Sequence, residues 1–417
     1  MTLRILLAAL ILTINGIALS QDRKFEFGRE APTNGVTLVS TGDIYSKEKG
    51  FGFENGAEVS CAESKCSSNK PFYFSAAVPE GNYRVTVRFG DKQNATSTVV
   101  KAELRRLMLE RVDTKRGEFV TRSFIVNVRT PLISTGGEVK LKDRERTSEQ
   151  WAWDERLTLE FNGSRPSISS IEIEKVDVPT VFLLGDSTVC DQPGEPYASW
   201  GQMITAFFSN KIAVANHAES GESLRSSLSA GRLEKVLSTM RPGDYLLIQY
   251  GHNDEKEKGD GVGAFTTYKA SLKRFIDAVR QKGGVPIVIT PVHRRTFDPA
   301  GKITNSHGDY PEAVRQVAKE ENVSLIDLTE LSKILYEALG PQGSGVLFKD
   351  GDGTHHNNYG AYELARSIVQ MIRDQSLSLQ KYVRKDITRF DPARPDPVAS
   401  FTLPASPPAA IAKPLGN

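Results

Sequence analysis

Apolar and polar residues alternate with a period of two through much of residues 22–178. Clusters of turn-forming residues separate the alternating segments. The clearest of these segments are 83–90, 123–130, 157–163 and 168–177. Several short strands, each buried on one face and joined by turns, predict an N-terminal β-sandwich domain over 22–178. The helical pattern in this half is confined to 101–112, which fits either a short helix or a further strand.

The pattern changes after Pro179, where continuous apolar strands alternate with helical stretches of 10 to 20 residues. The expected strands are 180–186, 212–218, 244–251, 285–292 and 323–328. The expected helices are 199–209, 232–240, 264–281, 310–321, 329–339 and 359–375. Strands that are apolar on both faces belong to parallel sheets covered by helices on each side. The pattern therefore predicts a flavodoxin-like, three-layer α/β/α domain over 179–380.

The two ends of the chain have a different composition. Arg4 precedes an apolar run at 5–14 that is short for a bilayer span, and Ala18 and Ser20 are small residues at the two positions that a signal peptidase recognises. We expect a signal peptide over 1–20 and export to the periplasm or the medium; an uncleaved anchor helix is the alternative. Residues 391–417 hold seven prolines and little periodicity, which predicts a disordered or extended tail.

Composition narrows the classes of partner. The net charge of +2 comes without a long basic block, which argues against a nucleic-acid partner. No segment of the mature chain is apolar enough to enter a membrane. Cys61 and Cys66 lie five residues apart in a loop-like stretch, so we expect a local disulfide in an exported protein, with Cys190 left over. Neither CxxC pairs nor HExxH occur, and we expect no metal site and no cofactor.

Polar residues gather where the predicted parallel strands end. Ser187 follows the first strand, Gly221 the second and Asn253 the third, while Asp352 and His355 lie in the loop before the last helix. Acyl transfer needs a nucleophile, a base, a group that orients the base, and donors for the oxyanion. We expect Ser187 to be the nucleophile, His355 the base and Asp352 the orienting carboxylate. The oxyanion donors would be the N–H groups of Ser187 and Gly221 and the Asn253 amide.

This ordered set resembles the SGNH (GDSL) hydrolase superfamily over 180–376. The stretches GDSTV, NHAESGES and DGTHHN, with the Trp-Gly-Gln at 200–202, are similar to its rhamnogalacturonan acetylesterase branch. Similar bacterial proteins carry an N-terminal β domain with stretches like 49–54 and 153–163. The resemblance implies a Ser-His-Asp esterase that removes acetyl groups from a plant cell-wall polysaccharide, above all acetylated rhamnogalacturonan. His356, directly after His355, is expected at the surface, with a substrate contact as the alternative.

Other readings of the substrate stay open. The polar loop that begins with His293 and Arg294 either meets the carboxylates of uronic acids or is a solvated insertion. The alternatives to a pectin substrate are an acetylesterase acting on xylan or other sugars, a lipid esterase or thioesterase, and a non-catalytic carbohydrate-binding protein. The last would use exposed aromatic side chains of the N-terminal half. The candidates are Phe72, Tyr73, Trp151 and Trp153, with a place in the core as the alternative for each. The oligomeric state is open.

Overall fold

The computed structural model describes residues 22–28, 35–54, 56–62 and 64–407. The expected signal peptide at 1–20 lies outside the described residues. Residues up to 175 form strands β1 to β12. Their bounds are Arg23–Phe27, Thr37–Val39, Phe51–Phe53, Ser60–Ala62, Lys65–Ser67, Phe72–Ala77, Gly81–Gly90, Thr96–Ala102, Arg106–Thr114, Phe119–Val128, Arg156–Arg165 and Ser167–Lys175.

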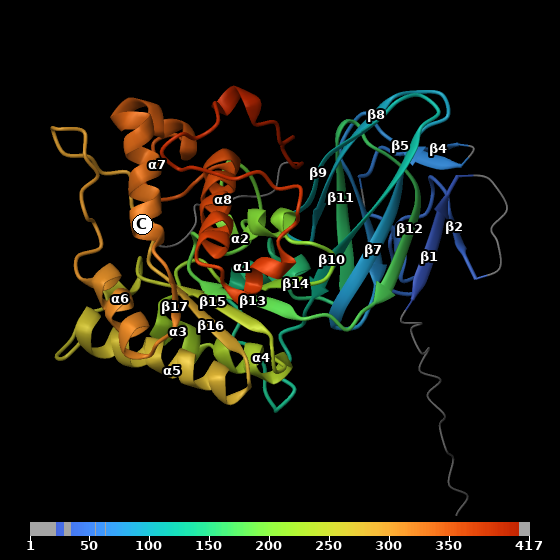
Figure 1. The fold of residues 1–417 in the computed structure, drawn as a ribbon. Coiled ribbons are helices and arrows are strands. Elements are labelled where there is room, and N and C mark those ends of the chain that lie inside the picture. Colours follow the sequence, from blue (N-terminus) through green and yellow to red (C-terminus); the bar gives the residue numbers. More distant parts are fainter. Residues whose placement is uncertain (1–21, 29–34, 55, 63, 408–417) are drawn as a thin grey trace, which may run out of the picture.

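These strands form two sheets, at one side of the molecule in Figure 1. The first runs β10-β7-β12-β1-β2, with the β4–β5 hairpin joined to β12, and the second runs β3-β6-β11-β8-β9. Alternate side chains of both sheets meet in one shared core rich in Phe, Val and Ile. In the hairpin, Cys61 pairs with Cys66, and the two form a disulfide with Cα atoms 4.0 Å apart.

The N-terminal half differs from expectation in where its helical turns lie. The ambiguous segment 101–112 is strand and turn: β8 ends at Ala102, β9 begins at Arg106, and a tight turn joins them. The expectation that helical structure would be confined to 101–112 is wrong. A single helical turn, α1 (Asp143–Arg146), and a 3-10 turn, η1 (Gln150–Ala152), lie elsewhere. Both are far shorter than the window of about 11 to 18 residues in which a helical period can be recognised.

The predicted parallel sheet is confirmed. Its strands β13 to β17 are Thr180–Gly185, Ala213–Asn216, Tyr245–Gln249, Val285–Ile289 and Ser324–Ile326. All four neighbouring pairs are parallel, in the order β14-β13-β15-β16-β17. This is the doubly wound order whose switch point, where crossovers change direction, lies beside the first strand.

Helices cover both faces of this sheet (Figure 1). The helices α2 to α8 are Trp200–Met203, Leu224–Ser229, Arg232–Thr239, Lys269–Gln281, Tyr310–Glu320, Leu328–Gly343 and Asn358–Asp374. Helices α2, α7 and α8 share a core with Val181 and Leu183 of β13, and α3 to α6 share another with Phe182 and Leu184. The expected helix 199–209 continues after α2 as a 3-10 turn, η2 (Ile204–Phe207), and α3 is the helix that the pattern did not predict.

The two halves are joined through the second N-terminal sheet. Val99 of β8 and Leu107 of β9 belong to the core that contains α2 and α8 rather than to the core of their own sheets. The outer face of that sheet is therefore packed against the α/β half. Among the described residues, no helix combines the length and apolarity that a membrane span requires.

Of the two states expected for the C-terminal segment, its described part shows the extended one. Residues 391–407 follow an extended path with one 3-10 turn, η7 (Val398–Ser400), and residues 408–417 lie outside the described part. Buried side chains accept this segment: Lys101 donates to the Pro404 carbonyl at 3.0 Å, and Asn162 donates to the Ala405 carbonyl at 2.7 Å. Proline lacks an N–H but keeps its carbonyl, so a proline-rich chain can still be fixed through its acceptors.

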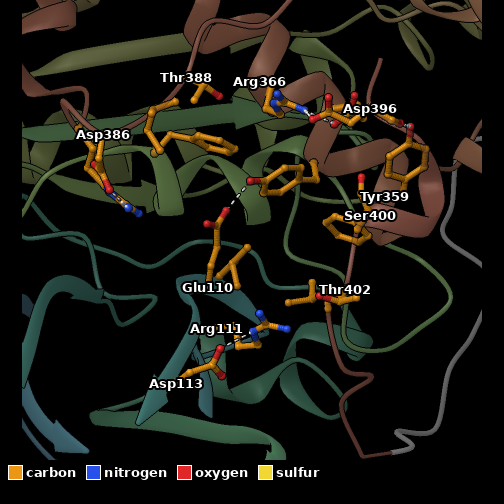
Figure 2. Close-up of a pocket in the computed structure, with 18 residues that line it drawn as sticks. Glu110, Arg111, Asp113, Tyr359, Arg366, Asp386, Thr388, Asp396, Ser400 and Thr402 are labelled. Carbon is orange, nitrogen blue, oxygen red and sulfur yellow. Dashed lines mark hydrogen bonds and ion pairs between the residues drawn. The ribbon is translucent and has the colours of Figure 1, made fainter. Parts of the chain in front are cut away.

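A pocket of about 470 Å³ lies between this segment, α8 and β9 (Figure 2). Its charged side chains are paired with neighbours that also line it. Arg366 bonds Asp396 at 2.6 Å, and Arg111 bonds Asp113 at 2.9 Å. Glu110 accepts a hydrogen bond from Tyr362. The Tyr362–Glu110 bond joins α8 to β9, and the Arg366–Asp396 pair joins α8 to the C-terminal segment.

Candidate active site

The turn after β13 presents Ser187. The Asp186 carboxylate accepts hydrogen bonds from the backbone N–H of Thr188 at 2.9 Å and from its hydroxyl at 2.8 Å. A side chain at Gly185 would place its Cβ 2.5 Å from Val189 and 2.6 Å from the Gln249 carbonyl. Residue 185 is therefore glycine because the turn folds back tightly on its own strand and on β15. Glycine and aspartate here build the turn that holds Ser187 in place.

Ser187, His355 and Asp352 form one hydrogen-bonded series. The Ser187 Oγ lies 3.0 Å from His355 Nε2, and His355 Nδ1 lies 3.0 Å from Asp352 Oδ2. The second carboxylate oxygen accepts the backbone N–H groups of Thr354 at 2.8 Å and His355 at 3.0 Å. Burial raises the pKa of Asp352, but these bonds from His355 and Thr354 outweigh it and hold the pKa well below its ordinary value. An ionised Asp352 favours the tautomer that leaves Nε2 free to accept the serine proton.

The loops after β14 and β15 come together beside this series. Gly221 has φ +78°, a left-handed conformation that glycine adopts without strain. The Asn253 amide donates to the carbonyl of Glu222 at 3.0 Å, which fastens the third loop to the second. The Ser220 hydroxyl lies 3.4 Å from the thiol of Cys190, which ties the second loop to the first. The structure thus brings together all three strand ends on which the expected oxyanion donors lie.

The N-terminal half reaches the same loops. Lys142, at the start of α1, donates to the Ser220 carbonyl at 2.5 Å and pairs with Glu222 at 2.8 Å. Arg144 lies 3.6 Å from the buried carboxylate of Glu219. The residues on both sides of Gly221 are therefore held by side chains from the other half of the chain.

A buried pair below the nucleophile turn was not anticipated from the sequence. Asp186 and His252 are both fully buried, and His252 Nδ1 lies 3.2 Å from the Asp186 carboxylate. Burial lowers the pKa of His252 to about 4 despite this carboxylate, so the ring is neutral at neutral pH. The pair joins the residue before Ser187 to the residue before Asn253. The sequence did contain a sign of this pair, because Asp186 in GDST and His252 in GHND each directly precede an expected site residue.

His356 is not at the surface, and this expectation is wrong. Its ring is buried, with Nε2 2.7 Å from the Tyr336 hydroxyl and its centroid 4.4 Å from that of Phe348. Burial, with a smaller contribution from His355, lowers its pKa to about 3. The alternative, a substrate contact, has no support in these packing partners. His356 instead anchors the loop of His355 to α7.

His293 and Arg294 are also engaged away from the series. His293 is buried and stacks on His307, while its backbone N–H donates to Ser332 at 3.1 Å. Arg294 pairs with Glu255 at 2.5 Å. In the described part of the chain, the structure does not bring either side chain into the hydrogen-bonded group of Ser187 and His355.

Comparison with known proteins shows to which family the chain belongs. The GDSL-like lipase/acylhydrolase family model matches residues 183–362, which contain the whole Ser187–His355–Asp352 series. A rhamnogalacturonan acetylesterase of Bacillus subtilis, RhgT, is 41% identical over 218 residues, covering 49% of this chain and 93% of its own length. The chain belongs to the GDSL-like lipase/acylhydrolase family. It is therefore an ester-hydrolysing serine hydrolase, in the branch of the rhamnogalacturonan acetylesterases.

Other relatives extend the comparison. YesY, described as a probable rhamnogalacturonan acetylesterase of B. subtilis, is 35% identical and covers 49% of this chain and 98% of its own length. YxiM, described as an uncharacterized esterase of B. subtilis, is 29% identical over 378 residues, 85% of this chain and 91% of its own. The similarity to this esterase therefore continues into the N-terminal half.

Proposed function

We propose that the chain is an exported carbohydrate esterase that removes acetyl groups from acetylated rhamnogalacturonan. The hydrogen-bonded series of Ser187, His355 and Asp352 carries the chemical part of this proposal. The 41% identity to RhgT supports the substrate. The Cys61–Cys66 disulfide is typical of an oxidising compartment and supports export after removal of 1–20.

The proposed reaction has two halves. His355 Nε2 takes the Ser187 proton as Oγ attacks the acetyl carbonyl, and the tetrahedral oxyanion is bound by the N–H groups of Ser187 and Gly221 and the Asn253 amide. The intermediate collapses, the carbon–oxygen bond to the sugar breaks, and the sugar hydroxyl leaves with the proton from His355. Water, deprotonated by His355, then attacks acetyl-Ser187 and releases acetate, and the serine regains its proton.

We also propose a division of labour between two domains. The β-sandwich domain, 22–178, would contact the polysaccharide, and the hydrolase domain, 179–380, would cleave the ester. Phe72 and Trp153 are buried, so they do not suit a sugar site. Tyr73 and Trp151 are half-buried with ring centroids 5.0 Å apart, and this pair is the aromatic surface that a sugar ring would contact.

The deciding experiment is acetate release from acetylated rhamnogalacturonan, with acetylated xylan and esters of short and long acyl chains measured alongside. The protein without residues 1–20 is compared with its Ser187→Ala variant. Release from rhamnogalacturonan that disappears in the variant supports both nucleophile and substrate. Release from xylan alone, or a preference for long acyl chains, overturns the proposed substrate. Equal release by the variant overturns the role of Ser187.

A further inference from the structure

The turn between β8 and β9 is strained and inserted into the α/β half. Glu103 and Arg105 have φ of 55° and 61°, left-handed values that residues other than glycine rarely adopt. The Gln202 side chain, from α2, donates to the Leu104 carbonyl at 2.8 Å. A strained turn that persists is one that its surroundings hold in place, and such strain is concentrated at functional sites.

The Arg105 side chain bonds four groups of the α/β half. The side chain is 5% exposed, and Nη1 donates to the carbonyls of Gln192 at 3.1 Å and Tyr197 at 2.9 Å. Nη2 donates to the Asn358 side chain at 3.0 Å and pairs with Glu195 at 2.6 Å. The planar fork of arginine suits several acceptors fixed at once, which the single ammonium of lysine cannot match.

These partners lead directly to the reacting side chains. Gln192 donates its amide to the Ser187 carbonyl at 2.8 Å. The Tyr197 ring meets the His355 ring edge-on, with centroids 5.9 Å apart. Asn358 is the first residue of α8, three positions after His355. A single buried side chain of the N-terminal half is therefore bonded to the supports of both Ser187 and His355.

We propose that Arg105 is a positioning residue for ester hydrolysis: it fixes the segment 192–197 and Asn358, and through them the Ser187–His355 geometry. The N-terminal half is then required for turnover of every ester, including esters without a sugar. This goes beyond a polysaccharide-contacting role for that half, and it rests on the proposed roles of Ser187 and His355. Because a misplacement of about 1 Å between reacting groups costs roughly 10²-fold, loss of the fork should lower kcat by that order.

The test uses p-nitrophenyl acetate, which lacks a sugar, with wild type, Arg105→Met and Arg105→Lys. Active sites are counted by complete labelling with a fluorophosphonate, so that kcat refers to folded protein. We expect kcat of Arg105→Met to fall roughly 10²-fold, with KM unchanged and slower labelling. The kcat of Arg105→Lys should lie between those of Arg105→Met and wild type. Arg122→Met, which alters an exposed arginine of the other N-terminal sheet, is the matched control and should behave as wild type.

The outcomes separate positioning from stability. Unchanged kcat per labelled site, even with a lower melting temperature, overturns the proposal and leaves Arg105 a structural residue. If Arg105→Met fails to fold, Gln192→Leu tests the connection from Arg105 through Gln192 to the Ser187 carbonyl. An unchanged kcat in Gln192→Leu also overturns the proposal. Wild-type activity in Ser187→Ala would instead refute the proposed nucleophile, so the two failures are distinguishable.

Discussion

Replacing Asp352 by asparagine tests the hydrogen-bonded series with almost no change in shape. One oxygen of Asp352 accepts two backbone N–H groups, from Thr354 and His355, and the other faces His355 Nδ1. An asparagine has only one oxygen. If that oxygen stays with the two backbone donors, the NH₂ group faces Nδ1 and forces the proton onto Nε2. If the amide is flipped, its NH₂ group meets two N–H donors without an acceptor, which costs about 1–3 kcal/mol.

The first arrangement has the lower free energy, and in it His355 can no longer act as a base. A protonated Nε2 then donates to Ser187 Oγ, where the mechanism needs an acceptor. We expect kcat on p-nitrophenyl acetate to fall about 10⁴-fold, or about 5 kcal/mol in activation free energy, with little change in KM. Asp350→Asn, at an exposed position in the same loop, is the control and should keep full activity. A loss below tenfold in Asp352→Asn would refute the assignment of Asp352 as the orienting carboxylate.

Three further results follow from the site and its surroundings. Asn253→Ala should fold but lose about 10²–10³ in kcat, because one oxyanion donor is missing; near-normal turnover removes Asn253 from that role. Burial lowers the pKa of His356 from its ordinary value of 6.5 to about 3 in the folded protein. Between pH 6.5 and pH 3 the unfolded chain therefore binds a proton at His356 that the folded chain does not bind. Its neutral form contributes stability above pH 6.5, and about 2 kcal/mol of unfolding free energy should be lost between pH 7 and pH 5. In urea unfolding at pH 7 and pH 5, the drop in unfolding free energy should be smaller by this amount in His356→Gln than in wild type. An equal drop in the two proteins would contradict the prediction. Trp151→Ala should raise KM for acetylated rhamnogalacturonan roughly tenfold while p-nitrophenyl acetate turnover stays constant; Phe265→Ala, 46% exposed elsewhere, is its control.

Much of the site can be predicted from the sequence because its chemistry lies in short local motifs. Asp352 and His355 lie three residues apart, and Ser187 follows an apolar strand directly, so spacing and strand ends are enough to propose them, and the structure brings the three side chains within hydrogen-bonding distance. The parallel sheet followed from the same kind of local pattern, since strands that are apolar on both faces need a helix layer on each side.

The features that were missed depend on partners far away in the chain. His356 looks identical to His355 in a one-dimensional pattern, and its burial is decided by Tyr336, which comes from α7. Arg105 lies in the stretch 101–112, whose pattern fits either a short helix or a strand, and its acceptors come from residues 192–197 and from Asn358. Composition reports which groups a segment carries, whereas these roles depend on which groups meet after folding.

The order of synthesis bears on the buried Lys101. This lysine lies on β8 in the N-terminal half and is 1% exposed, yet it donates to the Pro404 carbonyl and, at 2.7 Å, to the Ser406 hydroxyl. A growing chain produces the strand about 300 residues before the acceptors that satisfy it. Until those acceptors arrive, the ammonium group relies on carboxylates and solvent, and burying it without all its partners is costly. Lys101 on β8 therefore reaches its final hydrogen bonding only after the ribosome has made Pro404 and Ser406.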